Sequence, residues 1–149
     1  MKQLARIAKV MLISAIALVS QPLLAEQYVA YGNYEIHYNA FNSTFIQPNV
    51  AKNIGLQRSK RKALINVSVL KVDGVEKTPV TAHVTGKANN LIEQSQDLKF
   101  KKVDEGNAIY YLGQFGFSDG QVMRISLDVQ PDPNQPAYTI QFEDKFYEE

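Results

Sequence analysis

Alternation of apolar and polar residues with a period of two is the feature that most limits how this chain can fold. It recurs in five segments, which are residues 34–40, 65–70, 80–85, 123–130 and 138–143. Such alternation is typical of strands with one buried and one solvated face. Residues 98–103 and 108–117 supply two further strands. The pattern therefore predicts an all-β fold, an antiparallel β-sandwich of immunoglobulin-like type with about seven strands.

Turn-forming residues separate these strands. Asp73-Gly74, residues 104–107 and residues 118–120 are rich in Asp, Gly, Asn or Ser and predict hairpin turns. The segment 131–136 contains three prolines and cannot be a central strand. We expect it to cross from one sheet to the other.

One segment interrupts the period of two. Pro48 stands where a first helical turn tolerates proline, and Gly55 stands where a helix ends. Val50 and Ile54 are four residues apart, so one or two helical turns near residues 48–54 would direct both toward the core. Residues 88–97 fit a second short helix and a loop equally well.

The first 25 residues have the organisation of an export signal. Lys2, Arg6 and Lys9 make a basic start, and an apolar run of ten residues, 10–19, follows. That run is about half of the ~20 residues that span a bilayer. We predict cleavage after Ala25, a single domain over residues 26–149 and a periplasmic location, with no stable membrane anchor after cleavage. An uncleaved N-terminal anchor is the alternative.

Composition excludes several classes of function. The chain has no Cys, which rules out a thiol catalyst and a cysteine-based zinc site and fits a bacterial periplasm better than a eukaryotic secretory route. The predicted mature chain keeps 13 basic and 15 acidic residues, so nucleic acid is not an expected partner.

Metal ligands are scarce in the predicted mature chain. It keeps two histidines, His37 and His83, and one methionine, Met123. A copper site built from clustered His or Met would lack ligands, so we expect no metal and no cofactor. Both histidines fall on the polar phase of their strands. They approach each other if those strands pair, and otherwise face solvent separately.

The strongest local charge lies at residues 58–62, where four of five residues are basic. One interpretation is a binding site for an anionic ligand or an acidic protein patch. The other is a solvated, charged strand start that discourages edge pairing. A strand followed by a short helix would bring this segment close to the end of the first strand. The candidate binding residues are His37, Asn42, Ser43, Thr44, Arg58, Ser59 and Lys60.

Gly116-Phe117-Ser118-Asp119-Gly120 matches the G-x-S-x-G pattern of a nucleophile elbow. That motif works on a strand-to-helix turn, where the serine hydroxyl stands beside an oxyanion hole. Here no helix pattern follows, so we interpret the segment as a turn between two strands.

The central part of the chain resembles a family of exported gamma-proteobacterial proteins catalogued as domain of unknown function 4426. The resemblance rests on residues 37–45 (HYNAFNSTF), on Pro48-x-Val50-Ala51, on Gly55-x-x-Arg58-Ser59-Lys60 and on residues 66–69. It continues more weakly through residues 118–120, and Ile54 stands where an aromatic residue is expected. The resemblance implies an exported single-domain protein, and it supplies no activity that could be transferred to this chain.

These observations favour a periplasmic, non-catalytic domain that binds an envelope protein or an anionic ligand. Two alternatives remain open. One is a small enzyme with His37 as general base and Arg58 holding a substrate anion. The other is a structural subunit that associates through an exposed strand edge. The oligomeric state does not follow from the sequence.

Overall fold

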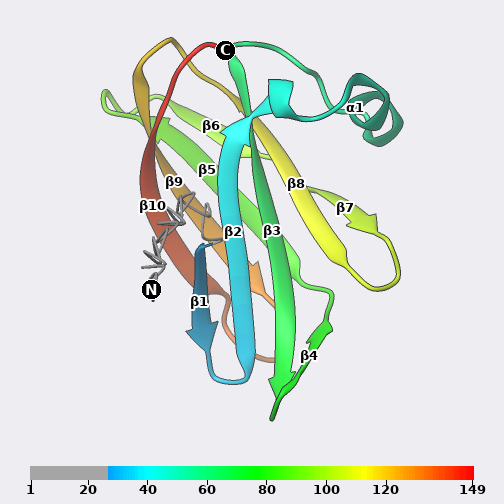
Figure 1. Ribbon diagram of the computed structural model, residues 1–149. Coiled ribbons are helices and arrows are strands. Elements are labelled where there is room, and N and C mark those ends of the chain that lie inside the picture. The colour runs from blue at the N-terminus through cyan, green and yellow to red at the C-terminus, as the bar shows by residue number, and fades with distance from the viewer. Residues whose placement is uncertain (1–26) are drawn as a thin grey trace, which may run out of the picture.

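The computed structural model describes residues 27–149, and the predicted signal peptide at residues 1–25 lies outside this range (Figure 1). The described residues form ten strands, a 3-10 helix and an α-helix. In chain order the elements are β1 (Gln27–Tyr31), β2 (Tyr34–Asn42), η1 (Ser43–Phe45), α1 (Pro48–Ile54), β3 (Lys62–Asp73), β4 (Glu76–Pro79), β5 (His83–Asn90), β6 (Ser95–Leu98), β7 (Lys101–Asp104), β8 (Ile109–Gly116), β9 (Gln121–Gln130) and β10 (Tyr138–Phe146).

Two antiparallel sheets pack face to face. The first sheet has the order β1-β2-β3-β8-β7, with β4 also paired to β3, and the second has the order β10-β9-β5-β6. The predicted antiparallel sandwich is confirmed. Ten strands are present instead of about seven because β1, β4 and β6 are only four or five residues long. Such short segments carry too few residues for a period of two to stand out.

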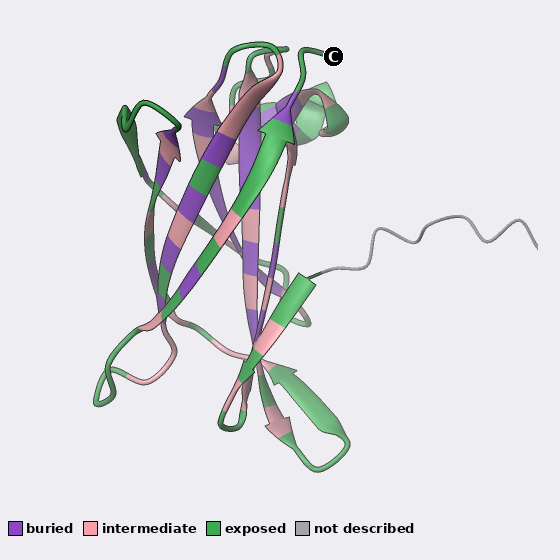
Figure 2. Ribbon diagram, turned by 90° about the vertical axis from the view of Figure 1, so that its left-hand side faces the viewer, coloured by how far each residue is buried: buried purple, intermediate pink, exposed green. Residues whose placement is uncertain are grey.

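The core lies between the sheets and follows the predicted alternation. Ile65, Val67 and Val69 on β3 face Leu127 and Val129 on β9 across the interior, and all five are fully buried. Buried and exposed bands accordingly alternate along the strands (Figure 2). Apolar packing is the main contact between the layers, because the chain has no Cys with which to form a disulfide.

Two of the predicted turns join different strands from those expected. Asp73-Gly74 and residues 104–107 connect paired strands, as predicted. Residues 118–120, however, carry the chain from β8 in the first sheet to β9 in the second, whereas residues 131–136 connect β9 and β10, which pair with each other. Both expectations were wrong because turn chemistry marks where a chain reverses, without specifying which sheet the next strand joins.

The predicted helix is present as α1, and Gly55 ends it in the left-handed conformation with a φ of 68°. The Leu56 N–H donates to the Ala51 carbonyl at 2.8 Å, which closes the helix end. Ala51 is the buried residue of α1, whereas Val50 is 42% exposed, so the expectation for Val50 was wrong. Ile54 is partly buried, so Ala51 is the one residue of α1 that is fully buried.

Residues 88–97 form the end of β5, a turn and β6, and no helix. Asn90 organises the turn, since its Oδ1 accepts hydrogen bonds from the N–H groups of Ile92 and Gln94 at 3.2 and 2.9 Å. Glu93 adopts a φ of 62°, which lets this short turn close.

Side chains join the two sheets along both open sides of the sandwich. On one side the Tyr31 ring stacks on Tyr138, with centroids 4.4 Å apart. On the other, the Gln96 amide donates to the Gly116 carbonyl and accepts from the Gly116 N–H, each at 2.8 Å. In residues 27–149 no helix has the length and apolarity needed to cross a membrane.

Candidate anion-binding surface

Residues 58–62, which we call the basic segment, lie beside the end of β2, as the sequence predicts. Both are at the end of the sandwich that carries α1 and the C-terminus (Figure 1). Ser43 joins them. Its hydroxyl donates to the Ser59 carbonyl and accepts from the Ser59 N–H, both at 2.9 Å. The Arg58 Nη2 donates to the Thr44 carbonyl at 3.0 Å. These three contacts fix the start of the basic segment against the end of the strand.

Most of the candidate residues at this end act as structural supports. Asn42 is buried, and its Nδ2 donates to the Tyr147 carbonyl at 2.7 Å, which ties down the C-terminal segment. Ser43 is 1% exposed, and Ser59 is held by it. Arg58 and Lys60 remain exposed. The most available side chains are therefore the two cations, of which Arg58 is held by the Thr44 carbonyl.

His37 lies apart from the other six candidates. It is in the middle of β2, where it opposes Ser68 on β3 and stacks on Tyr28 with ring centroids 5.1 Å apart. It precedes Asn42 by five residues, which is about 16 Å along an extended strand. A mechanism that combines His37 with Arg58 thus has no shared site. The two imidazoles do not meet either, because His83 is on β5 in the second sheet.

Glu35 receives two charged hydrogen bonds beside His37. The Lys77 Nζ donates to its Oε2 at 3.0 Å, and the His37 Nε2 lies 3.1 Å from the same oxygen. The bond from Lys77 lowers the pKa of Glu35 most, the bond from His37 lowers it further, and desolvation opposes both. The Glu35 side chain is only 13% exposed, and its bond from Lys77 links β2 to β4 on the outer face of the first sheet.

We expect Glu35→Gln to lower stability at neutral pH and to have less effect in acid. The folded pKa of Glu35 lies below its ordinary value of 4.5. The stabilisation is therefore complete above that ordinary value and is lost as the pH falls through the lower folded pKa. Thermal unfolding between pH 7 and pH 3 measures this. Glu76→Gln, at an exposed carboxylate on β4, is the control. A loss of stability in Glu35→Gln that stays constant from pH 7 down to pH 3 would contradict a lowered pKa for Glu35.

A hollow of about 350 Å³ adjoins the basic segment, between the end of α1 and strands β7 and β8. We call it the lysine hollow, after Lys62, Lys99 and Lys101, which line it together with Gln57, Asp97 and Gln114. The sequence analysis missed Lys99 and Lys101. The short basic run of residues 99–102 is visible in the sequence. Only the pairing of β7 with β8, and of β8 with β3, brings it beside Lys62.

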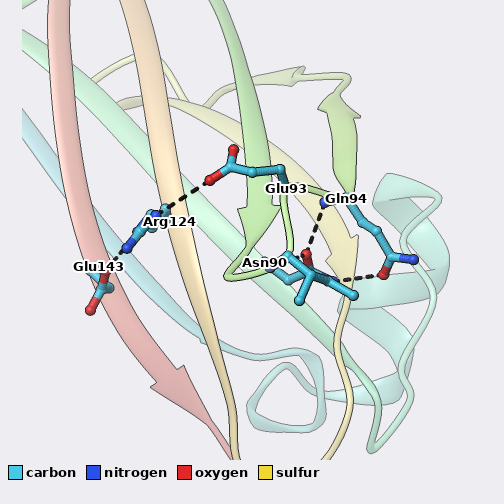
Figure 3. A network of polar contacts seen from close by, with 6 residues as sticks. Asn90, Glu93, Gln94, Arg124 and Glu143 are labelled. Carbon is cyan, nitrogen blue, oxygen red and sulfur yellow. Dashed lines mark hydrogen bonds and ion pairs between the residues drawn. The ribbon is translucent and has the colours of Figure 1, made fainter.

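A second hollow, of about 430 Å³, has a different charge balance. Its one cation, Arg124, lies between two carboxylates (Figure 3). The Arg124 Nε donates to Glu143 at 3.0 Å, and its Nη1 contacts Glu93 at 3.4 Å. The guanidinium is thus neutralised within the protein, which makes this hollow a poor site for an anion.

Residues 27–149 contain no group of three or more His, Cys, Asp or Glu side chains placed to hold a metal ion. His37 and Glu35 form a pair, and Lys77 donates to the same oxygen of the Glu35 carboxylate. The positive side chains of the basic segment and the lysine hollow are therefore the most distinctive chemical feature of the described surface.

Comparison with known proteins places this fold in a family. A search of curated proteins finds no match. Among solved structures, the chain is similar to FetP of uropathogenic Escherichia coli strain F11, expressed in the periplasm, with 12% identity, a TM-score of 0.57 and coverage of 82% of this chain and 93% of that one. It is also similar to a copper-bound variant of Campylobacter jejuni P19, with 10% identity, a TM-score of 0.52 and coverage of 81% and 94%. At these identities the likeness concerns the fold.

A DUF4426 family protein from Pseudomonas aeruginosa PAO1 is much more similar. It is 39% identical, with a TM-score of 0.72 and coverage of 83% of this chain and 96% of that one. The family described as "Domain of unknown function (DUF4426)" matches residues 28–149, which is nearly all of the described range. The chain therefore belongs to the DUF4426 family.

Proposed function

We propose that this protein is an exported, non-catalytic binding domain of the bacterial periplasm, which binds an anionic ligand or an acidic patch of an envelope protein. The binding region is the basic surface, formed by Arg58, Lys60, Lys62, Lys99 and Lys101. The predicted export signal supports the location, as does the fold shared with FetP, which was expressed in the periplasm.

The observation that carries the proposal is the concentration of unneutralised cations in one place. The whole predicted mature chain holds 13 basic and 15 acidic residues, so a local cluster of five cations is not a consequence of composition. Arg58 donates to the Thr44 carbonyl, a neutral acceptor, and so retains its charge. Such a field attracts anions and raises the rate at which they associate.

Copper is not the ligand that we propose, although copper-bound variants of FetP and P19 share the fold. Those two chains are 13% and 10% identical to this one. A fold hosts different functions at different sites, so the ligand has to be argued from the residues present. The basic surface offers ammonium and guanidinium groups, which bind anions and repel metal cations.

Association through a strand edge fits the structure less well. The strand β10 lies at the edge of the second sheet and is nine residues long. Just before its last residue it carries Glu143, Asp144 and Lys145, all exposed. Charged side chains on an edge oppose pairing with another chain. The basic surface is therefore the better candidate for the functional contact.

A pull-down from periplasmic extract tests the proposal. We expect the wild-type protein to retain a partner or ligand that the double variant Arg58→Ala/Lys60→Ala loses, and the retention to fall as salt is raised. The control variant Lys71→Ala/Lys145→Ala removes the same charge from the far end of β3 and from β10, and it should behave as wild type. Equal retention by wild type and Arg58→Ala/Lys60→Ala would rule out this surface.

A further inference from the structure

The lysine hollow carries positive charge that the protein does not neutralise. The Lys101 ammonium donates to the carbonyls of Ile54 and Gly55, at 3.3 and 2.7 Å, and the Lys62 ammonium donates to the side-chain oxygen of Gln57. All of these acceptors are neutral. Within residues 27–149, Lys99 forms no ion pair that would offset its charge.

Only one anion belongs to the lining of the hollow. Asp97 pairs with Lys87, which is outside it, at 3.8 Å, and both groups of that pair are largely exposed. The hollow is thus lined by three lysines and one aspartate, and the charge of that aspartate is partly offset by Lys87. An anion entering the hollow would gain the attraction of several ammonium groups at once.

The walls of the hollow are held in place without a ligand. Gln114 on β8 and Gln57 form a reciprocal pair, since the Gln57 N–H donates to the Gln114 Oε1 at 3.1 Å and the Gln114 Nε2 donates to the Gln57 carbonyl at 2.7 Å. Lys101 is fixed by the carbonyls at the end of α1, where its positive charge is also favoured by the helix dipole. A preformed site loses little conformational entropy when it binds.

The chemistry of the lining favours phosphate over carboxylate. Carboxylates in proteins are recognised best by the planar fork of Arg, and no Arg lines the hollow. Lys binds phosphate as a point charge, and several ammonium groups can contact different oxygens of one phosphate. The volume of about 350 Å³ suits a small ligand.

We propose that the lysine hollow binds a phosphate group, either as a free phosphate compound or as the headgroup of an anionic lipid. The inference rests on the proposed function, because it assigns the chemical class of ligand at part of the same basic surface. Lys99 supplies an exposed ammonium to the ligand, while Lys62 and Lys101 supply ammonium groups that are held by hydrogen bonds.

Titration with inorganic phosphate at constant ionic strength tests the site, with binding followed by the amide signals of Gln57 and Gln114 in NMR spectra. We expect Lys99→Ala to weaken binding by about tenfold, since a charged hydrogen bond is lost. Lys99→Ala is the informative variant because Lys99 supports no element of the fold. Lys71→Ala, at the far end of β3, should bind as wild type.

Vesicles distinguish the two sources of phosphate. Retention on phosphatidylglycerol vesicles but not on phosphatidylcholine vesicles, lost in Lys99→Ala, would identify a lipid headgroup. Binding of inorganic phosphate without retention on vesicles would identify a free phosphate compound. Failure to bind either, or equal weakening by Lys99→Ala and Lys71→Ala, would overturn the inference.

The proposed function and this inference fail separately. If the pull-down depends on Arg58 and Lys60 while phosphate does not bind, only the phosphate assignment falls. If phosphate binding depends on Lys99 while no partner depends on Arg58 and Lys60, the phosphate site is supported and the proposed function of the wider basic surface is overturned.

Discussion

Leu127→Ala is expected to destabilise the protein by about 2–5 kcal/mol, the cost of truncating a fully buried leucine in a close-packed core. Leu127 is 0% exposed on β9 and lies opposite Gly86 on β5 and Ile140 on β10. A Cβ placed on Gly86 would lie 3.0 Å from the Leu127 Cδ2, so the leucine occupies the space beside that glycine. Glycine has no side chain that can move into the cavity, which places the expected loss in the upper part of the range.

Chemical denaturation measures this loss, with Leu91→Ala as the matched control. Leu91 is in the turn between β5 and β6 and is 54% exposed. Its truncation should change the free energy of unfolding by no more than about 0.5 kcal/mol. Similar losses in the two variants would show that the interior is not packed as described.

Ser43→Ala is expected to cost about 1–3 kcal/mol, because it leaves the Ser59 N–H without its partner and removes one of the two hydrogen bonds to the Ser59 carbonyl, which then keeps only the bond from the Lys62 N–H. The Ser43 hydroxyl is donor to one of these groups and acceptor from the other. The Ala methyl group can neither donate nor accept a hydrogen bond, so both bonds of the Ser43 hydroxyl are lost. The start of the basic segment should therefore loosen as well, and the Ser59 amide should exchange its hydrogen faster.

Denaturation and hydrogen exchange together measure the effect of Ser43→Ala. Ser118→Ala is the control, since Ser118 is exposed in the turn between β8 and β9. Because we interpret its G-x-S-x-G context as a turn, loss of its hydroxyl should leave stability unchanged. Unchanged exchange at Ser59 in Ser43→Ala would contradict the role given to this serine.

The period of two was sufficient to predict the sandwich, because burial on one face leaves a direct trace in each long strand. It was not sufficient for the sheet order. Residues 118–120 and 131–136 both mark reversals, and the choice between pairing and crossing depends on contacts between distant strands. Pro48 and Gly55 predicted the bounds of α1 correctly because their backbone preferences are local.

The candidate surface was predictable only in part, for the same reason. Local reasoning placed the end of β2 beside Arg58 and Ser59, and the structure brings them together. The predicted surface also included His37, which is close to Asn42 in sequence. In the structure the extended strand β2 separates His37 from the basic segment. Lys99 and Lys101 were missed because their proximity to Lys62 results from the pairing of three strands.

Thiol footprinting at Lys60 tests most directly the central claim, that the basic surface is where the protein binds. The chain has no Cys, so Lys60→Cys and Lys71→Cys each carry a single reactive thiol. The rate of maleimide labelling is measured with and without periplasmic extract whose own thiols have been blocked. We predict that the extract slows labelling at position 60 and leaves position 71 unchanged. Equal rates at position 60 with and without extract, or equal protection at both positions, would contradict the claim.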